Sequence, residues 1–343
     1  MNLYWPVYKS IETEVLSLSS QIHFSDDQLS VYSIHIADLI VRCAVEIEAI
    51  SKELYKQLGG NMNPMGSDGQ PRDLYFDTDC MKLLNDTWHL DKKLVTVTAA
   101  TMYFQKTKDL HPLHKSDKRG TSGSKWKKAY QTLKHDRYGS LKQGTIENLL
   151  NALGALYILN IYYADDSYEA GIIGYGNLNF KSQYESKVFT PGGVGAYNLK
   201  FQDNADDSCI VWDADDDLEA AVYIGKYNDE VFRTRHFDWC VDQRWAKKRF
   251  NSDEKIQQYL KAHPEEKDKS IEEICLAVGG KKLLEEIVVD TMMLRSRYPK
   301  VEVRLNKGGN IYPAIPAPDE QEIDKEILTR WAEAMKLRRN LQW

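Results

Sequence analysis

The sequence lacks the cysteine patterns of a disulfide-stapled or zinc-binding protein. Its 343 residues include five cysteines, which are scattered and form no Cys-x-x-Cys pair. Such a set is typical of reduced thiols in a cytoplasmic protein. The beginning of the chain also lacks the charged-then-apolar pattern of a secretory signal. We therefore expect a cytoplasmic location.

Long apolar runs and an excess of positive charge are missing as well. The most apolar run, Leu149 to Tyr163, is interrupted by Asn151 and Asn160. It is short for a membrane span, so a buried helix is expected there and no membrane contact. The formal net charge of -6 does not mark the whole chain as a nucleic-acid binder, so an anionic partner must meet a local basic patch.

Complete motifs for metals and for phosphate loops are absent. The acidic run 213–217 resembles the opening of an EF-hand loop, but Leu218 and Ile224 stand where that loop needs glycine and glutamate. The glycine clusters at 171–176 and 192–195 are not followed by Lys-Ser/Thr or by a helix start, which favours turns in a sheet. We expect no metal and no cofactor.

Helical patterning dominates the chain before residue 165. The longest pattern starts after Ser25-Asp26-Asp27, which suit a helix N-terminus, and stops at Gly59-Gly60. The run VTVTAATMYF fits either a strand or a buried segment. We expect helices within residues 1–25, 28–58, 80–88, 126–138 and 146–162.

The pattern changes near residue 165. Runs rich in Gly, Tyr, Val and Phe predict antiparallel strands over about 166–236. Helical patterning returns over about 239–297, followed by the strand-like VEVRL and a final helix over about 319–341. The expected fold class is α+β, with an all-α helical bundle at 1–165 and a mixed α+β domain with an antiparallel sheet at 166–343.

The segment from Lys106 to Lys142 is strongly basic. It holds eleven lysines and arginines against three aspartates, a local charge of +8. Cations interleaved with aromatic residues suit a phosphate backbone with stacked bases. The residues expected to bind RNA or another anionic polymer are Lys118, Arg119, Lys125, Trp126, Lys127, Lys128 and Tyr130. The alternative is a solvated surface whose charge is offset by acids elsewhere in the fold.

His135 is the candidate acid or base within this segment. A histidine titrates near neutrality, so it can exchange a proton with a ribose hydroxyl or a leaving oxygen. Lys134 and Arg137 are expected to stabilise charge on a transferred phosphoryl group. The alternative is a structural histidine beside two solvated cations.

Three segments together resemble the HEPN superfamily of helical bundles. They are RCAVEIEAISKELY, WKKAYQTLKHDR and NLLNALGALYILNIYY, with a loop-rich insert after the first. The resemblance covers about residues 25–165 and is closest to uncharacterised bacterial members with a Lys-His-x-Arg motif. It implies RNA binding or metal-independent RNA cleavage in defence, toxin or RNA-processing systems, by two protomers whose sites face each other.

The resemblance also carries a site motif on one helix. It consists of an arginine, a polar residue, three to five other residues and then a histidine. The matching histidine is His135, and the arginine position falls on Tyr130, Ala129 or Lys128. A polar residue from the first long helix approaches the site in such folds, which makes Arg42 and Glu46 supporting candidates by position.

The leading expectation is an RNA-directed bacterial defence or stress protein, acting as a metal-independent endoribonuclease and as a homodimer. One alternative is a non-catalytic module that binds nucleic acid or a protein partner, with the second domain as sensor or adaptor. The other is a structural role for Lys134-His135-Asp136-Arg137, with the function in the strand-rich half.

Overall fold

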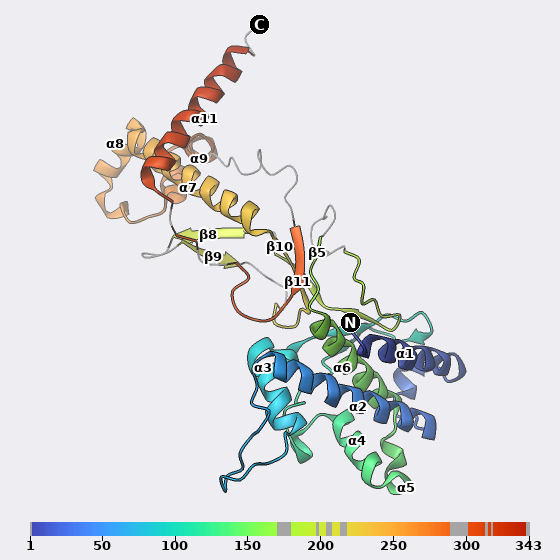
Figure 1. Ribbon diagram of the computed structural model, residues 1–343. Coiled ribbons are helices and arrows are strands. Elements are labelled where there is room, and N and C mark those ends of the chain that lie inside the picture. Colours follow the sequence, from blue (N-terminus) through green and yellow to red (C-terminus); the bar gives the residue numbers. More distant parts are fainter. Residues whose placement is uncertain are drawn as a thin grey trace. The chain divides into compact units, whose positions relative to one another are not determined.

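The computed structural model of the chain describes most of its residues and has an α+β fold, as the sequence predicts (Figure 1). The glycine cluster at 171–176 and the acidic run 213–217 lie outside the described residues. The described ranges are 2–169, 180–196, 199–203, 208–212, 218–288, 301–312, 315–316 and 318–340.

The chain forms two compact units that are interleaved along the sequence. Unit 1 contains residues 1–197, 214–226 and 301–311. Unit 2 contains residues 198–213, 227–300 and 312–343. Each unit therefore draws on more than one stretch of the chain.

In the described part of unit 1 the five expected helices are present with shifted ends, except that the segment 126–138 gives two helices instead of one. They are α1 Tyr4–Gln21, α2 Ile34–Gln57, α3 Lys82–Trp88, α4 Lys125–His135, α5 Arg137–Ser140 and α6 Ile146–Ala164. The predicted start of α2 at Ser25-Asp26-Asp27 is wrong, because Asp26–Gln28 forms a separate 3-10 turn. Ser33 caps the helix instead, its side-chain oxygen accepting the amide hydrogen of Ile36 at 3.1 Å.

Helix α6 is the centre of unit 1. Apolar side chains on all its faces are buried, as expected for a helix that neighbours surround. It packs most extensively against α2, and α1 and α4 also contact it. The close approach to α2 includes Gly144, where an added methyl group would lie 2.8 Å from the Cβ atom of Ala37.

The basic segment does not form one helix over 126–138. Helix α4 ends at His135, because Asp136 has a non-helical backbone with φ of -145°. Asp136 then caps the short helix α5, its Oδ1 accepting the amide hydrogen of Gly139 at 3.0 Å. His135 and Arg137 therefore belong to different helices.

Strands also contribute to unit 1, so its first 165 residues are not purely helical. The run VTVTAATMYF supplies β2 and β3, which resolves the ambiguity of its sequence pattern. The strands of unit 1 are β1 Phe24–Ser25, β2 Val95–Val97, β3 Met102–Tyr103, β4 Lys108–Leu110, β5 Tyr168–Glu169, β6 Phe189–Pro191, β7 Gly193–Ala196, β10 Tyr223–Tyr227, of which Tyr227 falls in unit 2, and β11 Val301–Leu305.

These strands form small mixed sheets. A three-stranded antiparallel sheet has the order β4-β2-β6, and a four-stranded sheet has the order β5-β11-β10-β7. Within the second, β5 and β11 are antiparallel whereas β7 and β10 are parallel. The expected antiparallel pairing is thus present, together with a parallel pair that the sequence pattern did not indicate.

Residue 165 ends α6 but does not end unit 1. The strands beyond it bury apolar side chains in the same core as the helices, among them Phe189, Tyr223 and Val303. A domain of residues 1–165 alone would leave that part of the core open. The structural division therefore differs from the predicted boundary.

Unit 2 is built around one long helix. It contains β8 Leu199–Asp203, β9 Ser208–Trp212, α7 Asp229–Ser252, α8 Glu254–Ala262, α9 Ile271–Ile287 and α11 Glu320–Asn340. Strands were predicted up to residue 236, yet α7 already starts at Asp229, capped by the side chain of Asn228. Gly280 interrupts α9 with φ of +65°.

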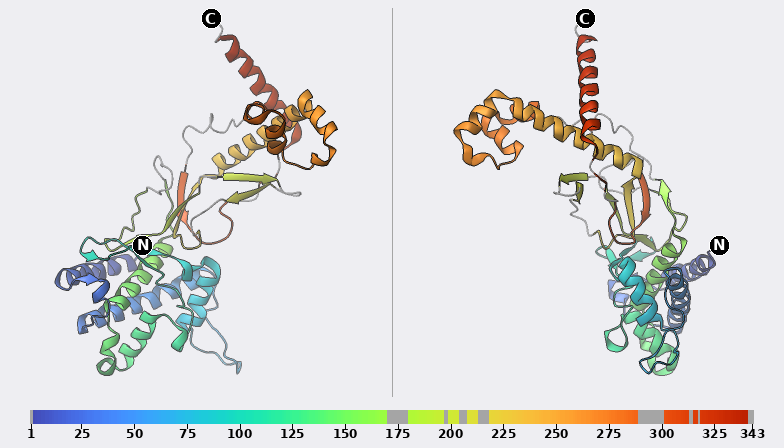
Figure 2. Two further views of the ribbon diagram at one scale, coloured as in Figure 1. Left: turned by 180° about the vertical axis from the view of Figure 1, so that it is seen from behind. Right: turned by 60° about the vertical axis from the view of Figure 1, so that its left-hand side comes forward.

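Figure 2 shows α8 and α9, in orange, beyond one end of α7, while α11, in red, crosses α7. Phe250 near the end of α7 joins Ile256 of α8 and Ile274 of α9 in a small apolar cluster. Arg244 of α7 forms a 2.7 Å ion pair with Asp324 of α11. Apolar contacts and ion pairs thus hold the four helices together.

Candidate nucleic-acid interface

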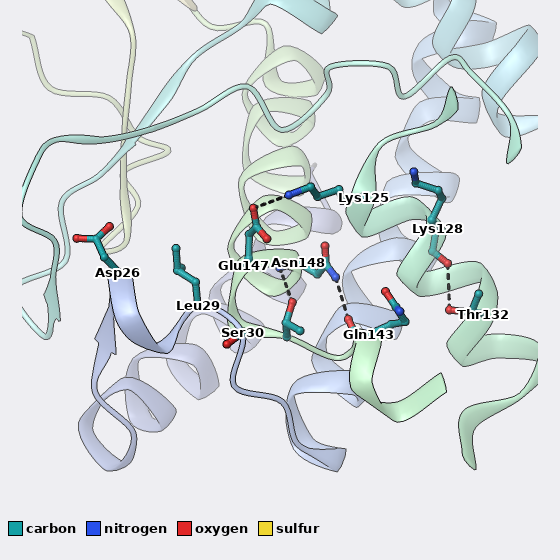
Figure 3. A pocket seen from close by; sticks show the side chains of 10 residues that line it. Asp26, Leu29, Ser30, Lys125, Lys128, Thr132, Gln143, Glu147 and Asn148 are labelled. Carbon is teal, nitrogen blue, oxygen red and sulfur yellow. Dashed lines mark hydrogen bonds and ion pairs between the residues drawn. The ribbon is translucent and has the colours of Figure 1, made fainter. Parts of the chain in front are cut away.

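An open groove lies along one face of α4 and is called the α4 groove below (Figure 3). It has a volume of about 610 Å³. Lys125, Lys128 and Thr132 line it from α4, and Glu147 and Asn148 line it from the start of α6. Because part of the basic segment lines it, the groove is the candidate site for an anionic partner.

The ammonium groups of the two groove lysines make exposed contacts. Lys125 is largely exposed and pairs with Glu147 at 3.1 Å. The Lys128 ammonium donates to the carbonyl oxygen of Thr121 at 3.1 Å. Both contacts are exposed, and contacts of this kind stabilise a fold by at most about 1 kcal/mol. A phosphate group can therefore compete for both cations.

Asn148 places an unused acceptor on the floor of the groove. Only 6% of its surface is exposed. Its amide nitrogen donates to the carbonyl oxygen of Gln143 at 2.9 Å, which identifies the other amide atom as the oxygen. Among the residues that the structure describes, this Oδ1 atom has no partner. A buried acceptor without a donor is costly, so a ligand N–H or O–H would relieve it.

His135 lies on the same side of α4 as the groove, at the exposed end of the helix. Seven residues separate it from Lys128, which leaves the two side chains about 20° apart around the axis. Within the described part of the chain, no hydrogen bond or ion pair holds its imidazole. The ring is therefore accessible to a polymer that follows the helix.

The two cations beside His135 occupy different surroundings. The Lys134 ammonium lies 5.5 Å from the centre of the Tyr130 ring. Arg137 forms an exposed 2.6 Å ion pair with Asp38 of α2. The structure therefore brings Lys134 and His135 to one end of α4, while Arg137 points to α2.

Both aromatic residues that were expected to contact RNA are buried. Trp126 is 2% exposed, and its ring nitrogen donates to the carbonyl oxygen of Pro112 at 2.7 Å. Tyr130 is also buried; this burial, together with the charge of Glu48, raises the pKa of its hydroxyl. Both rings pack in the core of unit 1, where no base can stack on them.

Lys127 is likewise structural, since it is 4% exposed. Its ammonium donates to the carbonyl oxygens of Ser116 and Lys118 and lies 3.3 Å from Asp77. Burial lowers the pKa of this ammonium, although Asp77 opposes the shift. Lys127 therefore fastens the loop before α4 to the segment before α3.

Two cations of the same loop are neutralised by neighbouring aspartates. Arg119 pairs with Asp77 at 2.7 Å and lies over the Tyr75 ring, and Lys118 pairs with Asp117 at 2.5 Å. Burial alone would raise the pKa of Asp77, but the hydrogen bond from Arg119 helps to hold it below its usual value. Lys118 and Arg119 lie on this loop and do not line the α4 groove.

The two supporting candidates from α2 face α1. Arg42 forms a 2.5 Å ion pair with Glu14 of α1. Burial and then the charges of residues that include Glu46 raise the pKa of Tyr4, which also belongs to α1. Helix α2 presents Asp38 and Glu48 to the α4 region instead.

The sequence offered uneven signals for these positions. Trp126, Ala129, Tyr130 and Leu133 follow helical spacing, so their burial was readable as one apolar face of α4. The sequence signal for Asn148 is a polar residue at the start of an otherwise apolar helix. Asp77 gave none, because nothing in the sequence links it to residues fifty positions away.

Comparisons of the chain with protein-family models, curated proteins and solved structures found no match. Among the described residues, no three His, Cys, Asp or Glu side chains group as metal ligands. Among those same residues, no helix is long and apolar enough to cross a membrane.

Proposed function

We propose that the chain is an RNA-directed protein of a bacterial defence or stress system and binds RNA along the α4 groove. The observation that carries this proposal is the convergence of Lys125, Lys128 and the Asn148 oxygen in one open groove, with His135 on the same face. Among the described residues, that oxygen has no hydrogen-bond partner. Lysines meet the phosphates, and the Asn148 oxygen accepts a hydrogen bond from a base amino group or a 2′-hydroxyl.

The proposed reaction is metal-independent cleavage of the RNA backbone. The ribose 2′-oxygen attacks the neighbouring phosphorus, the 5′-oxygen leaves, and a 2′,3′-cyclic phosphate remains. A base must take the 2′ proton and an acid must give one to the leaving oxygen. His135 supplies one of these roles, and His135 of a second protomer supplies the other in a homodimer.

Lys134 and Arg137 support this reaction by stabilising charge on the phosphoryl oxygens. Arg137 first has to leave Asp38, but exposed pairs of this kind stabilise by at most about 1 kcal/mol. The cost of freeing its guanidinium is therefore small beside the gain from a phosphate contact.

A second candidate is RNA binding without cleavage. The HEPN arginine position corresponds here to Tyr130, Ala129 or Lys128, of which the first two are buried and cannot touch a phosphate. Only Lys128 keeps a cation, and it lies in the groove. This placement favours binding over catalysis for a single protomer.

Purified protein, EDTA and a labelled mixed RNA pool separate the two candidates. Cleavage that His135→Ala abolishes and His114→Ala leaves intact supports the ribonuclease, since His114 is an exposed histidine of the same basic segment. Binding without cleavage supports the second candidate. The absence of both binding and cleavage would refute the RNA-directed function, and the mass in solution tests the homodimer.

Fluorescence anisotropy with single-stranded RNA tests the groove itself. Lys125→Gln with Lys128→Gln removes two phosphate contacts, so the slope of log K against log salt should fall by about 1.4. Lys106→Gln with Lys108→Gln is the matched control, because it removes the same charge outside the lining of the groove. An equal loss in both pairs would show that only total charge matters.

A further inference from the structure

A second cavity in unit 1, here called the β11 pocket, has no part in the proposed RNA site. It has a volume of about 400 Å³, within the range of small-molecule sites. Lys226 of β10, Arg304 of β11 and Lys307 of the following turn line it, as do Asp165 and Asp166 after α6. Figure 1 shows β5, β10 and β11 side by side where these segments meet.

Two of the pocket's three cations lie beside the partly exposed carboxylate of Glu302. Lys226 is 7% exposed although it is a lysine, and its ammonium lies 3.7 Å from Glu302. Arg304 Nη2 lies 2.9 Å from the same Glu302 oxygen and stays half exposed. Lys307 pairs with Asp165 at 2.6 Å. Three cations thus stand around one small cavity, which suits a compact anion such as a phosphate group.

Side-chain hydrogen bonds hold the turn after β11, and Gly309 leaves open space beside its backbone. Gly308 and Gly309 have φ of +76° and +75°, a region that favours glycine. Asn306 fixes the turn: its side chain donates to the carbonyl oxygens of Leu218 and Ala221 and accepts from the Gly308 amide. A preorganised turn of this kind lowers the entropy lost when a ligand binds.

The carboxylates give the pocket a second chemistry. Asp165 and Asp166 also line the pocket. Asp165 pairs with Lys307, so a bare anion that took over Lys307 would leave this carboxylate without its cation. Hydroxyl groups are the natural donors to such acceptors. A ligand that carries both a phosphate and neighbouring hydroxyls would use both sets of side chains.

We infer that the β11 pocket binds a phosphorylated sugar, either free or as the sugar–phosphate part of a nucleotide. The phosphate contacts Lys226, Arg304 and Lys307, and the sugar hydroxyls donate to Asp165 and Asp166. The pocket is distinct from the α4 groove, because the two share no lining residue.

Isothermal titration of the full chain with ribose 5-phosphate, adenosine monophosphate, inorganic phosphate and ribose tests the inference. Saturable binding of ribose 5-phosphate is expected, with inorganic phosphate at least tenfold weaker and ribose without effect. Tighter binding of adenosine monophosphate than of ribose 5-phosphate would identify the ligand as a nucleotide, and the reverse order would identify a free sugar phosphate. Equal affinity for ribose 5-phosphate and inorganic phosphate would overturn the inference, as would no saturable binding below about 10 mM.

Variants separate this pocket from the RNA site. Arg304→Gln should weaken ribose 5-phosphate binding about tenfold or more, because it removes a charge-assisted contact. Arg42→Gln is the matched control, an arginine of unit 1 with a similar exposed ion pair. RNA binding should survive Arg304→Gln, and the paired Lys125 and Lys128 variants should leave sugar-phosphate binding unchanged. Unaltered ribose 5-phosphate binding by Arg304→Gln would refute the assignment.

Discussion

Replacing Lys127 by methionine is expected to lower the free energy of unfolding by about 3–5 kcal/mol. Methionine keeps the length and apolar body of the side chain, so the change removes chiefly the buried ammonium. Asp77 and the carbonyl oxygens of Ser116 and Lys118 then lose a charged donor. Each such bond contributes about 1.5–3 kcal/mol, and the contributions are not additive.

The assay is thermal and urea unfolding of the full chain, followed by circular dichroism. For a unit of about this size, a loss of 3–5 kcal/mol lowers the melting temperature by roughly 6–20 °C. Lys128→Met is the matched control from the next position of α4, because its ammonium donates to a backbone oxygen in an exposed contact. That variant should change the free energy of unfolding by about 1 kcal/mol or less.

The opposite pattern would refute the structural role given to Lys127. A Lys127→Met protein that melts within a degree of the original and loses RNA affinity would mean that the ammonium reaches the ligand. The loop before α4 would then not depend on this side chain.

Three further outcomes follow from contacts in unit 1. The hydrogen bonds from Arg72 hold the pKa of Asp79 below its ordinary value, and the hydrogen bond from Arg119 helps to hold the pKa of Asp77 below its own against the effect of burial. The stabilisation from both carboxylates is complete above their ordinary pKa and is lost as the pH falls through their pKa values in the folded protein. The urea concentration at the unfolding midpoint should therefore fall as the pH is lowered below about 4, and it should fall less in Asp79→Asn. Gly144→Ala should destabilise by about 1–3 kcal/mol in urea unfolding, since the new methyl group meets the α2 backbone. Burial raises the pKa of the Cys43 thiol to about 12, so iodoacetamide at pH 8 should leave it unmodified by mass spectrometry until urea is added.

The regular parts of the fold were predictable because they depend on local patterns. The apolar length of α6 and the glycine stop after α2 identify both helices from sequence. The start of α2 was misplaced because Ser25-Asp26-Asp27 and Ser33 are both good caps, and packing decides between them. Asp136, likewise, is a favourable cap residue inside what reads as one helical segment.

The candidate site was predictable in place but not in detail. Positive charge on the α4 segment is a property of the sequence, whereas its neutralisation by Asp77 and Asp38 depends on tertiary folding. Separating the structural Lys127 from the accessible Lys128 also requires knowing which face of α4 is buried. The four-stranded sheet of unit 1 could not be predicted from local patterns, because its strand β11 comes from residues 301–305, far along the chain from the strands that it joins.

The interleaving of the two units has a consequence for synthesis on the ribosome. Residues 227–300 leave the ribosome before β11 does. Until β11 follows, the edge of β10 with which it pairs has no neighbouring strand. At about 5–20 residues per second this interval is on the order of 4–15 s. During it the nascent chain presents an unpaired strand edge, the kind of surface on which chaperones act and on which aggregation starts.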